Sequence, residues 1–294
     1  MTEPLEQIFT VLPASYIDAI QRLDETEQKC LTELRLRQGK QPTFVIGQQE
    51  HPLPVSHGAV VTEQDLTAIL SAAAEYSPYA VEHELAGGFL SLHGGHRIGL
   101  CGTAVMEQGR IKTIRQVSSL CIRVARPICG VGRELAAHLF ETQDSALIIG
   151  PPSSGKTTLL RDTIRLLSDC YASRVCVVDE RGEIAAMRFG LPQMNVGRQT
   201  DVLCGCKKDK GMILCLRAMN PQWIAVDEIT SEADISAISS ASYCGVKLLA
   251  TAHAANQQEL YERPVYRTLM NMGFFRSVYV LTPERTGSIV TLPC

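Results

Sequence analysis

The sequence has no apolar run long enough to cross a membrane. A helix needs about 20 consecutive apolar residues to span a bilayer, and the uninterrupted apolar runs here are short, such as Ala146–Ile149 and Cys176–Val178. The first residues, Met1–Glu6, are acidic and lack the apolar core of a secretory signal. We therefore expect a cytosolic protein whose contact with a membrane goes through a partner.

Aromatic residues, net charge and paired cysteines are also scarce. Aromatics make up 5% of the 294 residues and the formal net charge is −3, so the chain offers few surfaces for stacking nucleic-acid bases and no general attraction to phosphates. The 11 cysteines lie mostly in apolar stretches, and Cys204-Gly-Cys206 is the only tight pair. We expect buried thiols in a reducing compartment, not a disulfide framework or a metal site.

Residues 1–130 mix short helical and strand patterns. Residues Leu66, Ile69, Leu70 and Ala73 share one face of a helix at i, i+3, i+4 and i+7. The mixture predicts a small α+β domain. Its expected elements include a helix at Glu63–Ala74 and strands at Thr43–Ile46, Phe89–Leu92, Ile98–Val105 and Leu120–Val124.

Residues 131–294 alternate strands and helices. Several of the strands are continuous apolar runs, as strands buried on both faces should be. The alternation predicts the α/β class, with a parallel sheet covered by helices. The expected strands are Ala146–Ile149, Arg174–Val178, Trp223–Asp227, Lys247–Thr251, Ser277–Leu281 and Ser288–Thr291.

Two helices of this second part have clear sequence signals. The helix after the first strand carries Leu160 and Leu167 on its inner face, and we expect Asp162 on its outer face. Another helix begins at Ser231, where Asp234 three residues later completes a capping box.

The segment Ala146–Leu160 fits the phosphate-binding pattern G-x-x-x-x-G-K-T, with a strand before it and an amphipathic helix after it. Glycines at such a turn let backbone N–H groups and the helix N-terminus approach the phosphates of a nucleotide. Lys156 supplies charge to the γ-phosphate, and the Thr157 hydroxyl is a natural ligand of Mg²⁺. We expect binding and hydrolysis of ATP with Mg²⁺. The expected nucleotide contacts are Gly150, Pro151, Pro152, Ser153, Ser154, Gly155, Lys156, Thr157 and Thr158.

Two acids, Asp227 and Glu228, end the apolar strand that begins at Trp223. Carboxylates at the end of a buried strand lie at the carboxyl edge of the sheet, beside the phosphates. We expect Asp227 to hold the hydrated Mg²⁺ and Glu228 to orient or deprotonate the attacking water. Acids often follow strands, and the preceding phosphate loop is what gives this pair its functional interpretation.

A third acidic strand end, Asp179-Glu180, lies between these two motifs, with Glu183 close behind. These acids either lead the strand into the next element or face the metal and the attacking water. Whether Glu228 or Glu180 is the catalytic base stays open at this point.

A later strand ends with Thr251 and His253. A single histidine after a strand is usually a solvated loop residue. Its place one helix after the acid-tipped strand suits a sensor of the γ-phosphate.

Arginines of the first part, Arg97 and Arg123, and with less support Arg115, lie on expected strands. Such residues are mostly solvated. In an oligomeric ATPase, however, an arginine from a neighbouring subunit can neutralise charge that develops at the γ-phosphate.

Together these stretches resemble the family of stage III sporulation protein AA, ATPases of spore-forming bacteria related to the motor ATPases of type II and type IV secretion. The resemblance covers roughly residues 75–260 and is looser over residues 1–60. The matching stretches are Tyr79–Leu85, Gly94–Leu100, Ile111–Ile114, Ser118–Arg126, Gly150–Arg161, Val178–Ala185, Asp201–Cys206, Arg217–Pro221, Ile224–Ile229 and Thr251–His253.

The resemblance implies a RecA-like P-loop ATPase core preceded by a smaller adaptor-like domain, assembled as a ring hexamer. It makes Asp179-Glu180 the acidic box of the family and His253 its histidine box. It also implies a cytosolic motor, peripheral on the mother-cell face of the membrane, that serves a channel between mother cell and forespore. The implied partner is an integral-membrane protein of the same complex.

Two other functions remain as alternatives. RecA-like cores also drive nucleic-acid motors, and Arg217 and Lys207–Lys210 could contact phosphates. The charge and aromatic content speak against this reading, so no nucleic-acid partner is expected. A small-molecule kinase would need an arginine-rich lid, and no such segment is apparent in the sequence.

Overall fold

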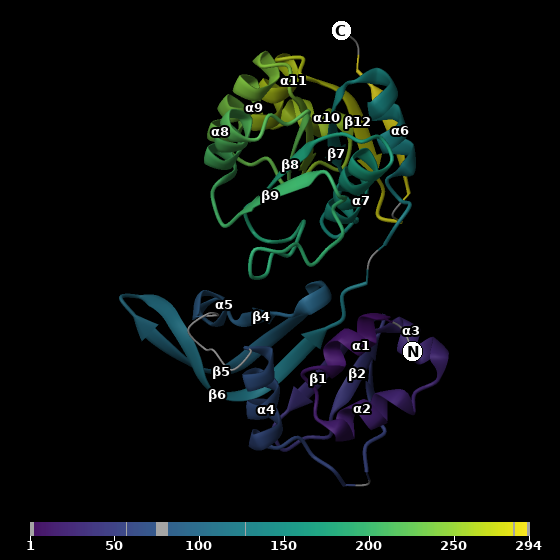
Figure 1. The fold of residues 1–294 in the computed structure, drawn as a ribbon, viewed down its shortest axis with the longest axis vertical. Helices are drawn as coiled ribbons and strands as arrows, with labels where there is room; N and C mark the ends of the chain where they lie inside the picture. The colour runs from purple at the N-terminus through teal and green to yellow at the C-terminus, as the bar shows by residue number, and fades with distance from the viewer. Residues whose placement is uncertain (1–2, 57, 75–81, 127, 285, 293–294) are drawn as a thin grey trace. The chain divides into compact units, whose positions relative to one another are not determined.

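The computed structural model describes residues 3–56, 58–74, 82–126, 128–284 and 286–292 (Figure 1). The chain divides into two compact units, Met1–Arg126 and Pro127–Cys294, a few residues before the division expected at 130/131. The beginning of the stretch Tyr79–Leu85 lies outside the described residues.

The N-terminal unit is an antiparallel sheet with helices packed on it. Its strands lie in the order β3-β2-β1-β6-β5-β4 around a core to which α1, α2 and α4 also contribute. Its elements are α1 (Glu3–Phe9), α2 (Ala14–Gln21), α3 (Glu25–Cys30), β1 (Leu31–Arg37), β2 (Thr43–Ile46), β3 (Gln49–Pro52), α4 (Glu63–Ala73), α5 (Glu82–Ala86), β4 (Phe89–Ser91), a 3₁₀ turn (His93–Gly95), β5 (Arg97–Glu107) and β6 (Arg110–Arg123).

The expected elements of this unit are present, but the sheet is larger than predicted. The strands β1 and β3 were not predicted, and β6 begins at Arg110 instead of near Leu120. In β1 the buried Leu34 and Leu36 alternate with more exposed polar residues, as in a strand buried on one face. The early part of β6 is mostly exposed, so no apolar alternation marks it in the sequence.

The C-terminal unit is a seven-stranded sheet with helices on both faces. No helix in the described ranges is both long and apolar enough to cross a membrane. The elements of the C-terminal unit are α6 (Arg133–Thr142), β7 (Ser145–Ile149), α7 (Lys156–Asp169), β8 (Val175–Asp179), β9 (Thr200–Cys204), α8 (Lys208–Ala218), β10 (Trp223–Val226), α9 (Glu232–Tyr243), β11 (Lys247–Ala252), α10 (Gln257–Glu262), α11 (Pro264–Asn271), β12 (Phe275–Leu281) and β13 (Gly287–Thr291).

The strand order of this sheet is β13-β12-β7-β11-β10-β8-β9, and all neighbouring pairs are parallel except β12 with β13. The helices α6 and α7 pack on one face, and α8, α9, α10 and α11 pack on the other. The strands β7, β8 and β10 are buried along their whole length, as their apolar runs predicted. The edge strand β9 was not predicted, because it is only partly buried and its apolar run, Val202–Cys204, is short.

The capping box at the start of α9 is confirmed. Ser231 accepts a hydrogen bond from the backbone N–H of Asp234, and the Asp234 carboxylate accepts one from the backbone N–H of Ser231. Leu160 and Leu167 are buried on the inner face of α7, also as predicted.

Candidate nucleotide site

The phosphate loop joins the end of β7 to the start of α7, and two glycines give it its shape. A Cβ atom at Gly150 would lie 2.7 Å from Ser154 Oγ and 2.9 Å from the carbonyl oxygen of Leu281, so no larger residue fits there. Gly155 has φ +99°, which residues with a side chain rarely adopt, and it is the N-cap of α7. The loop thus presents the backbone N–H groups at the start of α7 to an anion.

The hydroxyl of Ser154 supports the fit of this loop to a phosphate. Ser154 is buried, and its Oγ has no hydrogen-bond partner among the described residues. A buried polar group without a partner costs about 1–3 kcal/mol. An oxygen of a bound phosphate group would remove that cost.

Lys156 opens α7 and is only 7% exposed. Its ammonium donates hydrogen bonds to the carbonyl oxygens of Gly150 and Pro151, both at 2.9 Å, and lies 3.1 Å from His253 Nδ1. Burial lowers the pKa of Lys156, and the nearby carboxylates partly offset that effect. The positive charge is therefore held inside the loop by acceptors that phosphate oxygens can replace.

Asp227 follows β10 and joins three elements. Its Oδ2 accepts a hydrogen bond from Thr157 Oγ1 at 2.7 Å, and its Oδ1 accepts one from Thr251 Oγ1. Because β11 lies between β7 and β10 in the sheet, Thr251 near the end of β11 stands between the phosphate loop and the acid. The two residues expected to hold Mg²⁺, Thr157 and Asp227, are thus in direct contact.

Glu228 has an unusual backbone conformation, with φ +54°. Two hydrogen bonds hold it: the Glu228 N–H donates to Thr251 Oγ1 at 2.8 Å, and the Ile229 N–H donates to the Thr251 carbonyl oxygen at 2.9 Å. Its carboxylate lies 2.8 Å from Arg181 Nη1 and 3.4 Å from His253 Nε2. Glu228 and His253, both expected at the site, are therefore neighbours there.

The acids after β8 have different surroundings. Asp179 is buried, and its carboxylate accepts hydrogen bonds from the backbone N–H groups of Glu183–Ala185. Its carboxylate therefore shapes the loop after β8, in line with the first of the two alternatives given for these acids. Glu180 accepts a hydrogen bond from Lys208 Nζ at 2.9 Å, which lowers the pKa of Glu180. Glu183 lines the cavity described next.

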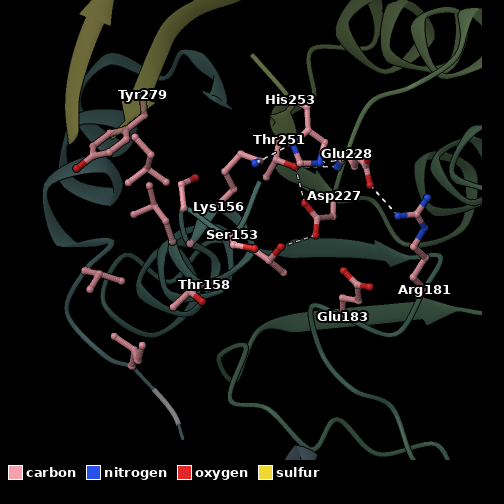
Figure 2. A pocket seen from close by; sticks show the side chains of 17 residues that line it. Ser153, Lys156, Thr158, Arg181, Glu183, Asp227, Glu228, Thr251, His253 and Tyr279 are labelled. Atoms are coloured by element: carbon pink, nitrogen blue, oxygen red, sulfur yellow. Dashed lines mark hydrogen bonds and ion pairs between the residues drawn. The ribbon is translucent and has the colours of Figure 1, made fainter. Parts of the chain in front are cut away.

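One cavity of about 560 Å³ lies in the C-terminal unit, within the usual range for small-molecule sites (Figure 2). Its polar lining includes the phosphate loop together with Arg181, Glu183, Asp227, Glu228, Thr251 and His253. Figure 2 shows Tyr279 at one end, Glu228 and Arg181 at the other, and Lys156 between them. The cavity also has apolar lining residues, Ile128, Val131 and Leu281.

A metal ion at this site would need ligands from a bound molecule. In the part of the chain that the structure describes, no three His, Cys, Asp or Glu side chains are grouped so that they could hold a metal. Mg²⁺ is usually bound by one or two carboxylates together with substrate phosphates and water. A hydroxyl and a carboxylate in contact, Thr157 and Asp227, fit that pattern.

Asp162 was expected on the outer face of α7, and this expectation is wrong. It is 2% exposed; its Oδ2 accepts a hydrogen bond from the Gly132 N–H at 2.8 Å, and its Oδ1 pairs with Arg165 at 2.6 Å. The contact holds the segment 128–132 against α7. In this way Asp162 supports the part of the cavity wall formed by Ile128 and Val131.

The arginines expected to complete the site, Arg97 and Arg123, belong to the N-terminal unit. The guanidinium of Arg97 lies 3.5 Å from the centre of the Phe89 ring, and Arg123 Nε lies 3.4 Å from Glu33 Oε1. Arg123 is well exposed, so this ion pair contributes little to stability. Their role at a nucleotide stays a prediction.

Some residues at or near the cavity were not expected from the sequence. They include Arg181, whose signal is its place directly after the acidic pair, and Lys208, which pairs with Glu180 outside the cavity. They also include apolar lining residues such as Tyr279. These apolar residues are far apart in the sequence and have no pattern that sets them apart from core residues.

The sequence matches the family described as sporulation stage III, protein AA, over residues 2–291. It is 36% identical over 270 residues to Stage III sporulation protein AA of Bacillus subtilis (strain 168), a match that covers 90% of this chain and 87% of that protein. Protein SEEDLING PLASTID DEVELOPMENT 1 of Arabidopsis thaliana is 34% identical over 177 residues, which are 55% of this chain and 24% of that protein. The family resemblance inferred from the sequence is confirmed.

Solved structures share the fold. The X-ray structure of the Legionella pneumophila ATPase DotB gives a TM-score of 0.58 at 16% identity, covering 91% of this chain and 77% of that chain. The crystal structure of the pilus retraction motor PilT with bound ADP gives 0.57 at 11% identity, covering 88% and 78%. The expected fold, a RecA-like P-loop ATPase core after a smaller α+β unit, is confirmed.

Proposed function

The chain belongs to the family of sporulation stage III protein AA, and on this basis we propose that it is a Mg²⁺-dependent ATPase that powers a sporulation channel complex. One observation carries the proposal. Lys156, Thr157, Asp227 and Glu228 come from α7 and the end of β10, and all four line one cavity. They supply a phosphate-binding charge, two metal ligands and a base, which together are the groups that phosphoryl transfer to water requires.

The cavity suits the two ends of ATP. The apolar lining residues, among them Tyr279 and Ile128, match a flat purine base, and the phosphate loop matches the phosphates. On binding, Lys156 exchanges the carbonyl oxygens of Gly150 and Pro151 for phosphate oxygens. Both PilT, solved with ADP, and DotB, an ATPase, share this fold.

Thr157 and Asp227 would hold Mg²⁺, Asp227 through the water shell of the ion. When bound, the ion neutralises charge on the phosphates. Thr251 keeps the Asp227 carboxylate in place, since its hydroxyl bonds to Oδ1. The same hydroxyl accepts a hydrogen bond from the backbone N–H of Glu228. One threonine therefore positions both acids.

Hydrolysis follows from the position of Glu228. A water oxygen attacks the γ-phosphorus, the bond from that phosphorus to the bridging oxygen breaks, and the proton of the water passes to Glu228. Glu180 is less suited to this step, because its carboxylate is paired with the buried Lys208. His253, which contacts both Lys156 and Glu228, is placed to report on the γ-phosphate.

The cellular part of the proposal rests on family membership. We place the protein in the cytoplasm, peripheral on the mother-cell side of the membrane, as a hexamer that acts on an integral-membrane protein of a channel between mother cell and forespore. Fractionation of sporulating cells tests this placement. The protein should sediment with membranes while that partner is present and should lose the association when the partner is deleted.

Replacing Glu228 by glutamine tests the choice of base. The amide keeps the size of the side chain but cannot take up a proton, so Glu228→Gln should bind ATP and hydrolyse it about 10²–10⁴-fold more slowly. Glu180→Gln, the matched control, should keep most of the activity. Phosphate release and calorimetric ATP binding measure both effects. Normal hydrolysis by Glu228→Gln together with loss in Glu180→Gln would move the base to Glu180.

Replacing Arg123 by alanine tests whether a second subunit completes the site. Arg123→Ala should bind ATP nearly normally and hydrolyse it about 10³–10⁵-fold more slowly. Arg110→Ala, at an exposed position on the same strand, serves as the control. Mixing Arg123→Ala with Lys156→Ala should restore activity, since some interfaces then join an intact loop to an intact arginine. Full activity of Arg123→Ala alone would make Arg123 an ordinary surface residue.

A further inference from the structure

Arg181 lies on the wall of the nucleotide cavity, and its side chain is 63% exposed. Its hydrogen-bond partner within the described ranges is Glu228, whose Oε2 accepts from Arg181 Nη1 at 2.8 Å. A guanidinium carries five N–H donors in a planar fork. Most of the donors of Arg181 therefore remain for another acceptor in the cavity.

The loop that carries Arg181 is fixed on both sides of it. Before it, Glu180 is tied to Lys208 at 2.9 Å. After it, Arg161 donates hydrogen bonds to the carbonyl oxygens of Glu183 and Ile184 at 2.6 and 2.5 Å. The backbone is held in place while the side chain is solvated, so the guanidinium can change partner by rotation of the side chain alone.

A chain of contacts links this guanidinium to the phosphate loop. Arg181 contacts Glu228, Glu228 contacts His253 at 3.4 Å, and His253 lies 3.1 Å from Lys156 Nζ. The two cations, Arg181 and Lys156, therefore lie on either side of Glu228 and His253. The terminal phosphate of a nucleotide would lie at this end of the cavity. A new anion there competes with Glu228 for Arg181, as it competes with the loop carbonyls for Lys156.

Resting on the proposed function, the geometry points to Arg181 as a contact to the γ-phosphate from the same subunit, one that exchanges between Glu228 and that phosphate. With a diphosphate in the site, Arg181 stays on Glu228 and occupies its carboxylate. With a triphosphate, Arg181 moves to the γ-phosphate, because an arginine pairs with phosphate through two parallel hydrogen bonds. Glu228 is then free to accept a proton from water. One movement of Arg181 therefore both favours ATP over ADP and frees the carboxylate of Glu228.

The test compares the affinities for the non-hydrolysable ATP analogue AMP-PNP and for ADP, each with Mg²⁺, in the full chain. A charged hydrogen bond contributes about 1.5–3 kcal/mol, so Arg181→Ala should weaken AMP-PNP binding by about 10- to 100-fold and leave ADP binding within about twofold. Arg181→Lys keeps the charge without the fork and should fall in between. Arg198→Ala, which removes an exposed arginine paired with Asp169, should match the wild type.

Three results would overturn the inference. If Arg181→Ala binds AMP-PNP as tightly as the wild type, the arginine makes no contact with the γ-phosphate. If the affinities for both nucleotides fall equally in Arg181→Ala and Arg181→Lys, its role is to support the site as a whole. If the wild type binds neither nucleotide, the proposed function itself fails and the inference fails with it. A melting curve for each variant separates these results from loss of the fold.

Discussion

The carboxylate of Asp227 is the contact on which the rest of the site depends. It accepts hydrogen bonds from Thr157 at the start of α7 and from Thr251 near the end of β11. Three elements that are far apart in the sequence therefore meet at one group, and the order of the parallel strands makes this possible. Because Thr251 also fixes the backbone of Glu228, the position of the proposed base follows from the position of the proposed metal ligands.

The charged side chains in and beside the cavity each have a partner. Lys156 is held by carbonyl oxygens of its own loop, Glu228 by Arg181, and Glu180 by Lys208. Only the first two of these pairs lie on groups that face the cavity. Under the proposed function, a nucleotide with a terminal phosphate would compete for both of their cations, whereas the pair between Glu180 and Lys208 lies outside the cavity. The structure thus separates the acids that shape the site from the acid that can act in it.

Sequence patterns predicted the parts of the molecule that are determined by interactions between residues close together in the chain. The phosphate loop, the acid-tipped strand before Asp227 and the capping box at Ser231 each depend on residues close together in the chain, and each is present. The strands β1 and β9 were missed, because each is only partly buried and neither carries a long continuous apolar run. The burial of Asp162 was also missed, since its partner Gly132 lies in a segment 30 positions away. The pairing of Arg181 with Glu228 depends in the same way on the fold, which brings together residues 47 positions apart.

The central claim is that the loop around Lys156 is the phosphate site of an ATP-binding cavity, and calorimetric titration of Mg-ATP tests it most directly. Lys156→Ala removes the buried cation of the loop, whereas Lys210→Ala removes a lysine that is 82% exposed and serves as the matched control. We predict that the wild type and Lys210→Ala bind ATP, and that Lys156→Ala loses binding with an unchanged circular dichroism spectrum and melting curve. ATP affinity in folded Lys156→Ala equal to that of the wild type would contradict the account.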